Sequence, residues 1–128
     1  MRKLLIGLPL ALIALAGPGA ARDRNAVPEA TPDGPPVSCI NLISIRQSHV
    51  RSDKVIDFEM SGGKYYRNEL PNACPQLGFE QRFSYQTSLS QLCSTDIITV
   101  LQDPPVMRGA GCGLGQFQPV TLAKAPHR

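Results

Sequence analysis

The sequence predicts a small all-β domain, an antiparallel barrel or sandwich of about six strands. Three observations lead to this prediction. Apolar and polar residues alternate with a period of two in several segments, as they do in strands that have one face in water. Glycine and proline, 11 and 12 of the 128 residues, separate these segments and favour turns. Finally, no long stretch carries an apolar stripe at helical spacing.

The clearest element is a hairpin from Lys54 to Leu70. Its first strand alternates apolar with acidic residues, so one face should pack in the core and the other should lie in water. The apolar side chains are Ile56, Phe58 and Met60, and the acidic ones are Asp57 and Glu59. Ser61-Gly62-Gly63 predicts a tight turn, because glycine readily adopts positive φ. Residues 65–70 form the returning strand.

One strand is predicted on each side of the hairpin. Ile40–Val50 precede it, with Ile43 and Ile45 on one face. Phe79–Tyr85 follow it and again alternate apolar with polar positions. The next segment, Thr87–Ser94, fits either a short helical turn or a loop.

The last two strands are Asp96–Gln102 and Leu114–Val120. The first contains a compact β-branched run, which is typical of a central strand with two apolar faces. Gly109–Gly115, between them, lacks the glycine at the sixth position that a dinucleotide-binding loop needs. This segment is therefore interpreted as a turn or bulge around a disulfide.

The first 21 residues have the organisation of an export signal. Arg2 and Lys3 precede an apolar run of thirteen residues, and small residues follow up to Ala21, after which we expect cleavage. The run is too short to cross a hydrocarbon core of about 30 Å as a helix. Pro18 stands where a bacterial lipoprotein has its lipidated cysteine. We therefore expect a periplasmic or secreted protein, not a lipoprotein, with no stable membrane insertion after cleavage.

The rest of the chain is predicted to hold one domain between two loose ends. Residues 22–37 contain four prolines and no run of large apolar residues, which favours a disordered linker. Residues 38–120 form the β domain, and residues 121–128 form a flexible tail. A domain of this size buries only about 60% of its unfolded surface, so disulfides stabilise it materially.

The charge of the domain argues against nucleic acid as a partner. Residues 38–120 hold seven basic and seven acidic side chains. Nucleic-acid-binding domains carry a basic patch or stripe, and anionic membrane surfaces attract basic segments. The balanced charge favours neither kind of partner.

Four cysteines are predicted to form two disulfides, because the export signal directs them to an oxidising compartment. Successive cysteines are 35, 19 and 19 residues apart, which fits neither a zinc site nor a thioredoxin-like motif. Three pairings are possible. We favour Cys39–Cys112, which would join the two ends of the domain, together with Cys74–Cys93.

Few side chains of the domain are candidates for catalysis or metal binding. His49 is the only histidine of the domain and is interpreted as an exposed residue near a turn. Asp57 and Glu59 would lie about 7 Å apart on one strand face. Paired carboxylates can perform acid–base or metal chemistry, but the wet face of an amphipathic strand accounts for them without it. We therefore predict no catalytic residue, no cofactor and no metal.

The best candidate for recognition is the cluster of Tyr65, Tyr66, Arg67 and Asn68. Tyrosine and arginine are favoured at the energetic centres of interfaces. On a strand, Tyr65 and Arg67 share one face, and Tyr66 and Asn68 share the other. These four residues are the predicted binding surface.

A succession of motifs runs from Cys39 to Phe117. They are Ile56-Asp57-Phe58, Asn68-Glu69-Leu70, Cys74-Pro75-Gln76-Leu77, the Leu-Cys-x-x-Asp element of Leu92–Asp96, and Cys112–Phe117. In this order they resemble a family of small exported proteins from Gram-negative bacteria, a domain of unknown function. The resemblance implies export and a single domain, and it implies no activity. Asp96 is interpreted as a turn or strand-start residue that accepts backbone hydrogen bonds.

Two functions of different classes follow. The first is a non-catalytic periplasmic binding or envelope-associated module, whose partner is an unidentified envelope protein or ligand. The second is a small inhibitor of a secreted enzyme, because Ser61–Tyr65 is similar to the Ser-Gly loop of periplasmic inhibitors of C-type lysozyme. A small hydrolase ranks third, and it would require a cleft that brings His49 together with Asp57 or Glu59.

Overall fold

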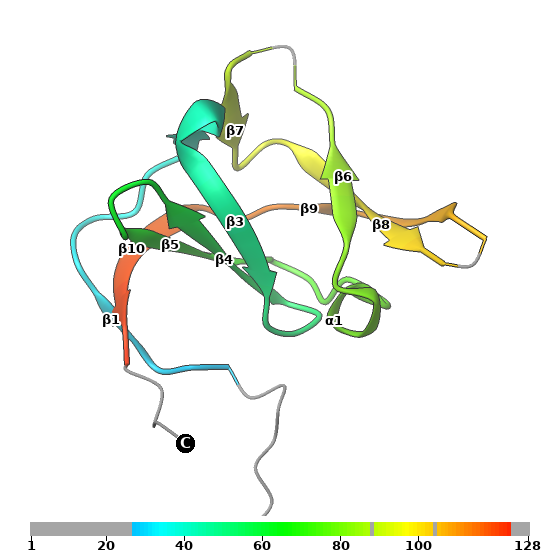
Figure 1. Ribbon diagram of the computed structural model, residues 1–128, viewed down its shortest axis with the longest axis horizontal. Coiled ribbons are helices and arrows are strands. Elements are labelled where there is room, and N and C mark those ends of the chain that lie inside the picture. Colours follow the sequence, from blue (N-terminus) through cyan, green and yellow to red (C-terminus); the bar gives the residue numbers. More distant parts are fainter. Residues whose placement is uncertain (1–26, 88, 104, 124–128) are drawn as a thin grey trace, which may run out of the picture.

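The computed structural model describes residues 27–87, 89–103 and 105–123. The expected export signal and its cleavage point lie outside the described residues, as do residues 22–26 of the expected linker and 124–128 of the expected tail. Over the described residues, ten strands form three antiparallel sheets (Figure 1).

The large sheet has the strand order β1-β10-β5-β4-β3, and the small sheet has the order β6-β8-β9. The strands of the large sheet are β1 (Ala30–Pro32), β3 (Ile45–Val50), β4 (Val55–Met60), β5 (Tyr65–Glu69) and β10 (Phe117–Leu122). Those of the small sheet are β6 (Phe83–Tyr85), β8 (Ile97–Gln102) and β9 (Met107–Gly113). A separate pair is formed by β2 (Cys39–Asn41) and β7 (Gln91–Cys93). The short helices are η1 (Leu42–Ser44), of the 3-10 type, and α1 (Leu77–Glu80).

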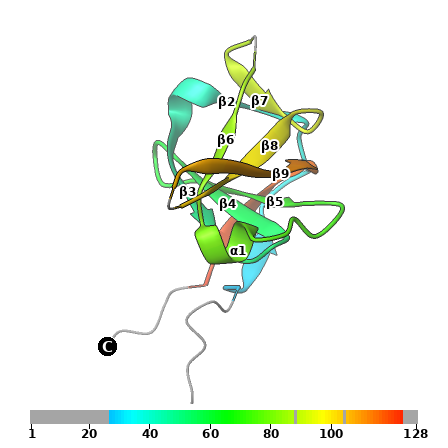
Figure 2. The same ribbon diagram turned by 90° about the vertical axis from the view of Figure 1, so that its right-hand side faces the viewer.

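One hydrophobic core lies between the large and small sheets. The small sheet stands in front of the large one in Figure 2, and the β8–β9 hairpin extends away from the body in Figure 1. Phe58 of β4 meets Phe83 of β6 and Phe117 of β10, with ring centroids 6.4 and 5.6 Å away. This arrangement confirms the predicted antiparallel all-β class, although the sheets do not close into a barrel over the described residues.

The predicted hairpin is confirmed as β4 and β5, which pair in register from Val55–Glu69 to Glu59–Tyr65. Ile56, Phe58 and Met60 are buried, as the period-two pattern predicts. Burial of a side chain of this size contributes about 1.5–3 kcal/mol. The hairpin therefore supplies much of the core's apolar surface.

Part of the expected linker belongs to the large sheet. Residues 30–32 form β1 and pair with β10, so the expectation of disorder is wrong for them. Further along, Val37 forms a bridge with Phe117. A proline-rich segment can occupy this position because β1 is an edge strand, where a missing N–H breaks no ladder bond. The sheet also includes Thr121 and Leu122, which were assigned to the flexible tail.

The predicted strand over residues 79–85 is only half correct. Residues 77–80 form α1, and just Phe83–Tyr85 form a strand. Leu77 is fully buried, whereas Phe79 is 80% exposed. The Asp53 carboxylate accepts a hydrogen bond from the Gly78 N–H at 2.7 Å, which ties this turn of helix to the β3–β4 connection. Such a tertiary contact overrides a short alternating pattern.

The segment Ile40–Val50 is not one strand. Asn41 ends β2, and its side chain caps the helix η1 by accepting a hydrogen bond from the Ile43 N–H. Ile43 is consequently 83% exposed instead of packing on one face with Ile45. The ambiguous segment that follows α1 and β6 contains β7, which pairs with β2.

The strand β8 is central in the small sheet, as predicted, but only one of its faces is apolar and buried. Ile98 and Val100 are fully buried, whereas Ile97 is 56% exposed. The glycine-rich segment is also a strand, β9, because its backbone pairs with β8. Residues without side chains carry no periodic pattern, so this strand is invisible to that kind of prediction.

The favoured disulfide pairing is wrong: the bonds are Cys39–Cys93 and Cys74–Cys112. Cys39 and Cys93 lie directly opposite each other in the β2–β7 pair, with Cα atoms 4.0 Å apart. Cys74 precedes α1 and reaches Cys112 on β9. The ends of the domain are instead held together by the β1–β10 pairing. Both disulfides fit the expectation of an exported protein.

Candidate functional site

One face of the large sheet points away from the core, and we call it the outer face. The antiparallel register places His49, Asp57 and Arg67 in one row across β3, β4 and β5. Glu59 and Tyr65 form the next row. Five of the residues that the sequence pointed out for chemistry or recognition are thus neighbours on this face.

Asp57 is not on a wet face, because it is completely buried beneath two arginines. Its Oδ2 accepts hydrogen bonds from Arg51 Nε at 2.8 Å and from Arg67 Nη2 at 2.9 Å, and its Oδ1 accepts from Arg67 Nε at 2.8 Å. Arg67 also donates to the Pro28 carbonyl at 3.0 Å, which fastens the chain before β1 to this face. We call Arg51, Asp57 and Arg67 the ionic triad.

The ionic triad has a structural role. Burial by itself raises the pKa of Asp57, but the hydrogen bonds and charges of Arg67 and Arg51 outweigh it and hold the pKa below its usual value. Both oxygens of the carboxylate are occupied by guanidinium groups. Asp57 is therefore a buried, ionised anchor whose two oxygens are both hydrogen-bonded to arginines.

His49, Glu59 and Tyr65 form a second cluster, which is partly exposed. His49 Nε2 lies 3.0 Å from Glu59 Oε1, and the rings of His49 and Tyr65 are 6.0 Å apart. The hydrogen bond to His49 lowers the pKa of Glu59. Desolvation, followed by the charge of Glu59, raises the pKa of Tyr65. No serine, threonine or cysteine contacts this cluster in the hydrogen bonds of the described chain, so it has a base and an orienting acid but no nucleophile.

The predicted surface of Tyr65, Tyr66, Arg67 and Asn68 is divided between the two faces of β5, as the strand alternation requires. Arg67 is engaged in the ionic triad. Asn68 is fully buried, where it donates to the Gly115 carbonyl at 2.7 Å and accepts from the Gly115 N–H at 2.8 Å. Only the two tyrosines remain available. Tyr66 lies under the Lys64 ammonium, 5.4 Å from its ring centroid, at a shallow cavity of about 270 Å³.

Two further positions behave as the sequence predicts. Asp96 Oδ2 accepts a hydrogen bond from the Cys93 N–H at 2.7 Å, so it is a turn residue. The turn between β4 and β5 is exposed, and Gly62 and Gly63 adopt φ values of 90° and 85°. This is the segment similar to the lysozyme-inhibitor loop, and it is a tight turn in the structure.

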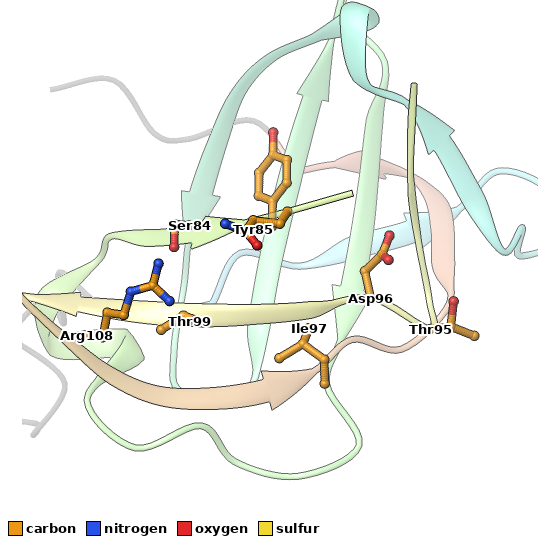
Figure 3. Close-up of a pocket in the computed structure, with 8 residues that line it drawn as sticks. Ser84, Tyr85, Thr95, Asp96, Ile97, Thr99 and Arg108 are labelled. Atoms are coloured by element: carbon orange, nitrogen blue, oxygen red, sulfur yellow. The ribbon is translucent and has the colours of Figure 1, made fainter. Parts of the chain in front are cut away.

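A larger cavity, of about 300 Å³, opens on the solvent-facing side of the small sheet, and none of the predicted site residues lies in it. All three strands and the β7–β8 turn contribute to it. Its lining consists of Ser84, Tyr85, Gln86, Thr95, Asp96, Ile97, Thr99 and Arg108. In Figure 3 the Arg108 side chain extends toward Ser84, and Asp96 lies at the other end of the group. We call this the small-sheet cavity.

The lining of the small-sheet cavity is suited to recognition. Arg108 is exposed and, within the described part of the chain, forms no ion pair. Its guanidinium shares the cavity with the hydroxyl groups of Ser84 and Thr99 and with the half-exposed Ile97. A guanidinium with neighbouring hydroxyl donors is the typical environment for a carboxylate or phosphate, and Ile97 adds an apolar contact. No pattern in the sequence indicated this cavity, because the run of residues 97–101 predicts a strand that is apolar on both faces.

Within residues 27–87, 89–103 and 105–123, no group of three or more His, Cys, Asp or Glu side chains is placed to hold a metal ion. The same residues include no helix that is long and apolar enough to span a membrane. Comparison of the chain with protein-family models, with curated proteins and with solved structures found no match.

Proposed function

We propose that this chain is a non-catalytic binding module of the periplasm or of the secreted fraction, and that it recognises its partner through the small-sheet cavity. The observation that carries the proposal is the Arg108 guanidinium, which forms no ion pair among the described residues. It lines a cavity together with hydroxyl groups, Ile97 and, at the other end, Asp96. Such a mixture orients a ligand without altering it.

The candidate catalytic groups support binding over catalysis. Asp57 is buried and hydrogen-bonded through both oxygens to Arg51 and Arg67. His49 and Glu59 contact each other but line neither of the two cavities described above. A hydrolase needs its base beside a bound substrate, and this arrangement does not supply that.

Export is part of the proposal. The amino-terminal pattern of Arg2, Lys3 and a short apolar run supports it, and the two disulfides require an oxidising compartment for their formation. We place the mature protein in the envelope of a Gram-negative bacterium, where the resemblance of the chain to exported proteins also points.

The substitution Arg108→Gln is expected to weaken capture of the partner about tenfold or more, because a hydrogen bond to a charged group is worth about 1.5–3 kcal/mol. The oxidised mature protein serves as bait in an envelope extract, and the captured protein is quantified by mass spectrometry. Arg46→Gln is the matched control, since Arg46 is also an exposed strand arginine, on β3 of the other sheet. Equal capture by the two variants would remove the small-sheet cavity from the proposal.

The alternative function, inhibition of a secreted enzyme such as C-type lysozyme, would use the exposed turn Ser61–Lys64. The turn projects Ser61 and two glycines into solvent, which is the observation in its favour. We expect the wild-type protein at micromolar concentration to leave lysozyme activity unchanged. Inhibition that is lost in Ser61→Lys but kept in Arg108→Gln would establish the alternative instead.

A further inference from the structure

We infer that the free edge of β9 accepts an extended peptide segment of the partner as an additional strand. The inference rests on the proposed function and names the chemistry of its partner: a linear peptide that carries an acidic side chain. It is drawn from the backbone register of the small sheet, from its glycines and from Arg108.

The register determines which backbone groups face the edge. The Leu114 N–H donates to the Asp96 carbonyl, so these two residues form a hydrogen-bonded pair next to the β8–β9 ladder. Hydrogen-bonded and non-hydrogen-bonded pairs alternate along an antiparallel ladder. Cys112 therefore bonds with Ile98, while the N–H and C=O groups of Gly111 and Gly113 point away from β8.

The other side of β8 leads to the same conclusion independently. The Leu101 N–H donates to the Arg82 carbonyl, which makes Ser84 and Thr99 the next hydrogen-bonded pair between β6 and β8. The backbone groups of Thr99 thus face β6, away from Gly111. Gly111 is left with an N–H and a C=O that β8 does not engage.

The edge is open as well as unpaired. Gly111 and Gly113 are both exposed, although Cys112 between them is tied to Cys74. A Cβ atom added at Gly113 would meet no atom within 4 Å, and one at Gly111 would lie 3.5 Å from Ile97 Cγ2. The two glycines therefore form a strip without side chains beside Ile97. A side chain from an added strand can lie on this strip and contact Ile97.

Charge and size identify the occupant as a peptide. A strand that pairs with Gly111 and Gly113 continues past Arg108, whose guanidinium has no acidic partner in the described chain, so an acidic residue there is favoured. A β-bulge opposite Val100 limits regular pairing to the glycine end of β9. The regular edge therefore has the length of one short peptide segment, whereas a stable interface between two copies of the chain requires roughly 1,000 Å² of buried surface.

The first test is amide hydrogen exchange, read by NMR on the oxidised protein. The amides of Gly111 and Gly113 are expected to exchange freely, whereas the amide of Cys112 is expected to be protected. Slow exchange at both glycines would show that the edge is already covered, and it would overturn the inference.

The second test is selection of binders from a display library of random linear peptides. The selected peptides are expected to bind Gly111→Pro about tenfold more weakly than Gly111→Ala, the effect of one lost hydrogen bond. Proline removes the outward N–H without breaking a bond to β8, and alanine keeps it. Thermal unfolding checks that each variant is folded. If Gly111→Pro is unfolded, Gly113→Pro and Gly113→Ala are compared in its place.

The outcomes separate this inference from the proposed function. Some peptides could fail to bind Arg108→Gln and still bind the folded proline variants as tightly as the wild type. Such peptides would occupy the small-sheet cavity alone, which would overturn strand addition and support the proposed function. Failure to select any peptide would overturn strand addition. The proposed function would then still be decided by the comparison of Arg108→Gln with Arg46→Gln.

Discussion

Replacement of both Cys74 and Cys112 by alanine is expected to lower the free energy of unfolding by about 4 kcal/mol. The bond spans 38 residues, and the cost is the loop-closure entropy that the unfolded chain recovers when the cross-link is removed. Cys74 is also completely buried, so its sulfur is lost from the core. Because domains are stable by only about 5–15 kcal/mol, the variant should unfold at a much lower urea concentration.

The same experiment tests the pairing. Trypsin cleaves after Arg67, Arg82 and Arg108, so each cysteine falls in a different peptide. Mass spectrometry of the non-reduced digest should show Cys39 linked to Cys93 and Cys74 linked to Cys112. In the alanine variant the Cys39–Cys93 link should persist. A digest that joins Cys74 to Cys93 would contradict the structure, and unfolding of the variant within about 1 kcal/mol of wild type would contradict the stabilising role given to the bond.

The substitution Asp57→Ala is expected to destabilise the protein by about 3 kcal/mol, the lower end of the range for breaking a buried ion pair. It leaves Arg51 and Arg67 facing each other with no carboxylate between them. Their side chains are 22% and 17% exposed, so water relieves part of the cost. Loss of the triad should also loosen the chain before β1, because Arg67 would no longer be held where it donates to the Pro28 carbonyl. Urea unfolding at neutral pH measures the first effect, and amide exchange in β1 the second.

The control is Asp103→Ala, the same substitution in an exposed ion pair. Arg82 and Asp103 are 3.5 Å apart, and both side chains are 46% exposed. An exposed pair of this kind contributes about 0–1 kcal/mol. If the two alanine variants lost the same stability, the ionic triad would not be the anchor that its burial indicates.

Asp57 also predicts how stability changes in acid. Its pKa is lower in the folded protein than in the unfolded chain. Its contribution is therefore complete above the unfolded carboxyl pKa of about 4, and it is lost as the pH falls through the lower, folded value. The difference in unfolding free energy between wild type and Asp57→Ala should accordingly shrink below about pH 4 and stay constant between pH 5 and 7. A difference that grows in acid would contradict this assignment.

Local patterns determined a large part of this molecule. Alternation in Ile56–Met60 and the turn at Gly62-Gly63 predicted the β4–β5 hairpin, because side-chain direction along a strand and the φ values of a turn depend on adjacent residues. The division of Tyr65 and Arg67 from Tyr66 and Asn68 follows for the same reason. Together, these patterns were sufficient for the antiparallel all-β class.

The candidate sites were harder to predict, because each depends on residues that are distant in the chain. Alternation marks Asp57 as polar and outward, but its burial depends on Arg51, which follows β3, and on Arg67 of β5. The sequence of β9 shows no period-two pattern that would predict a strand, because its glycines have no side chains that could alternate between two faces. The small-sheet cavity brings together Arg108 of β9 and Thr99 of β8, and these residues share a sheet only because the two strands pair.

The sequence by itself determined the strand periodicity, the hairpin, the balanced charge of the domain and the presence of cysteines suited to disulfides. Only the tertiary structure decided which cysteines pair, that residues 30–32 complete the large sheet, and which polar side chains are buried or free. The physical reason is the range of the interactions. Turn and strand preferences act over a few residues, whereas disulfides, ion pairs and sheet edges are set by the path of the whole chain.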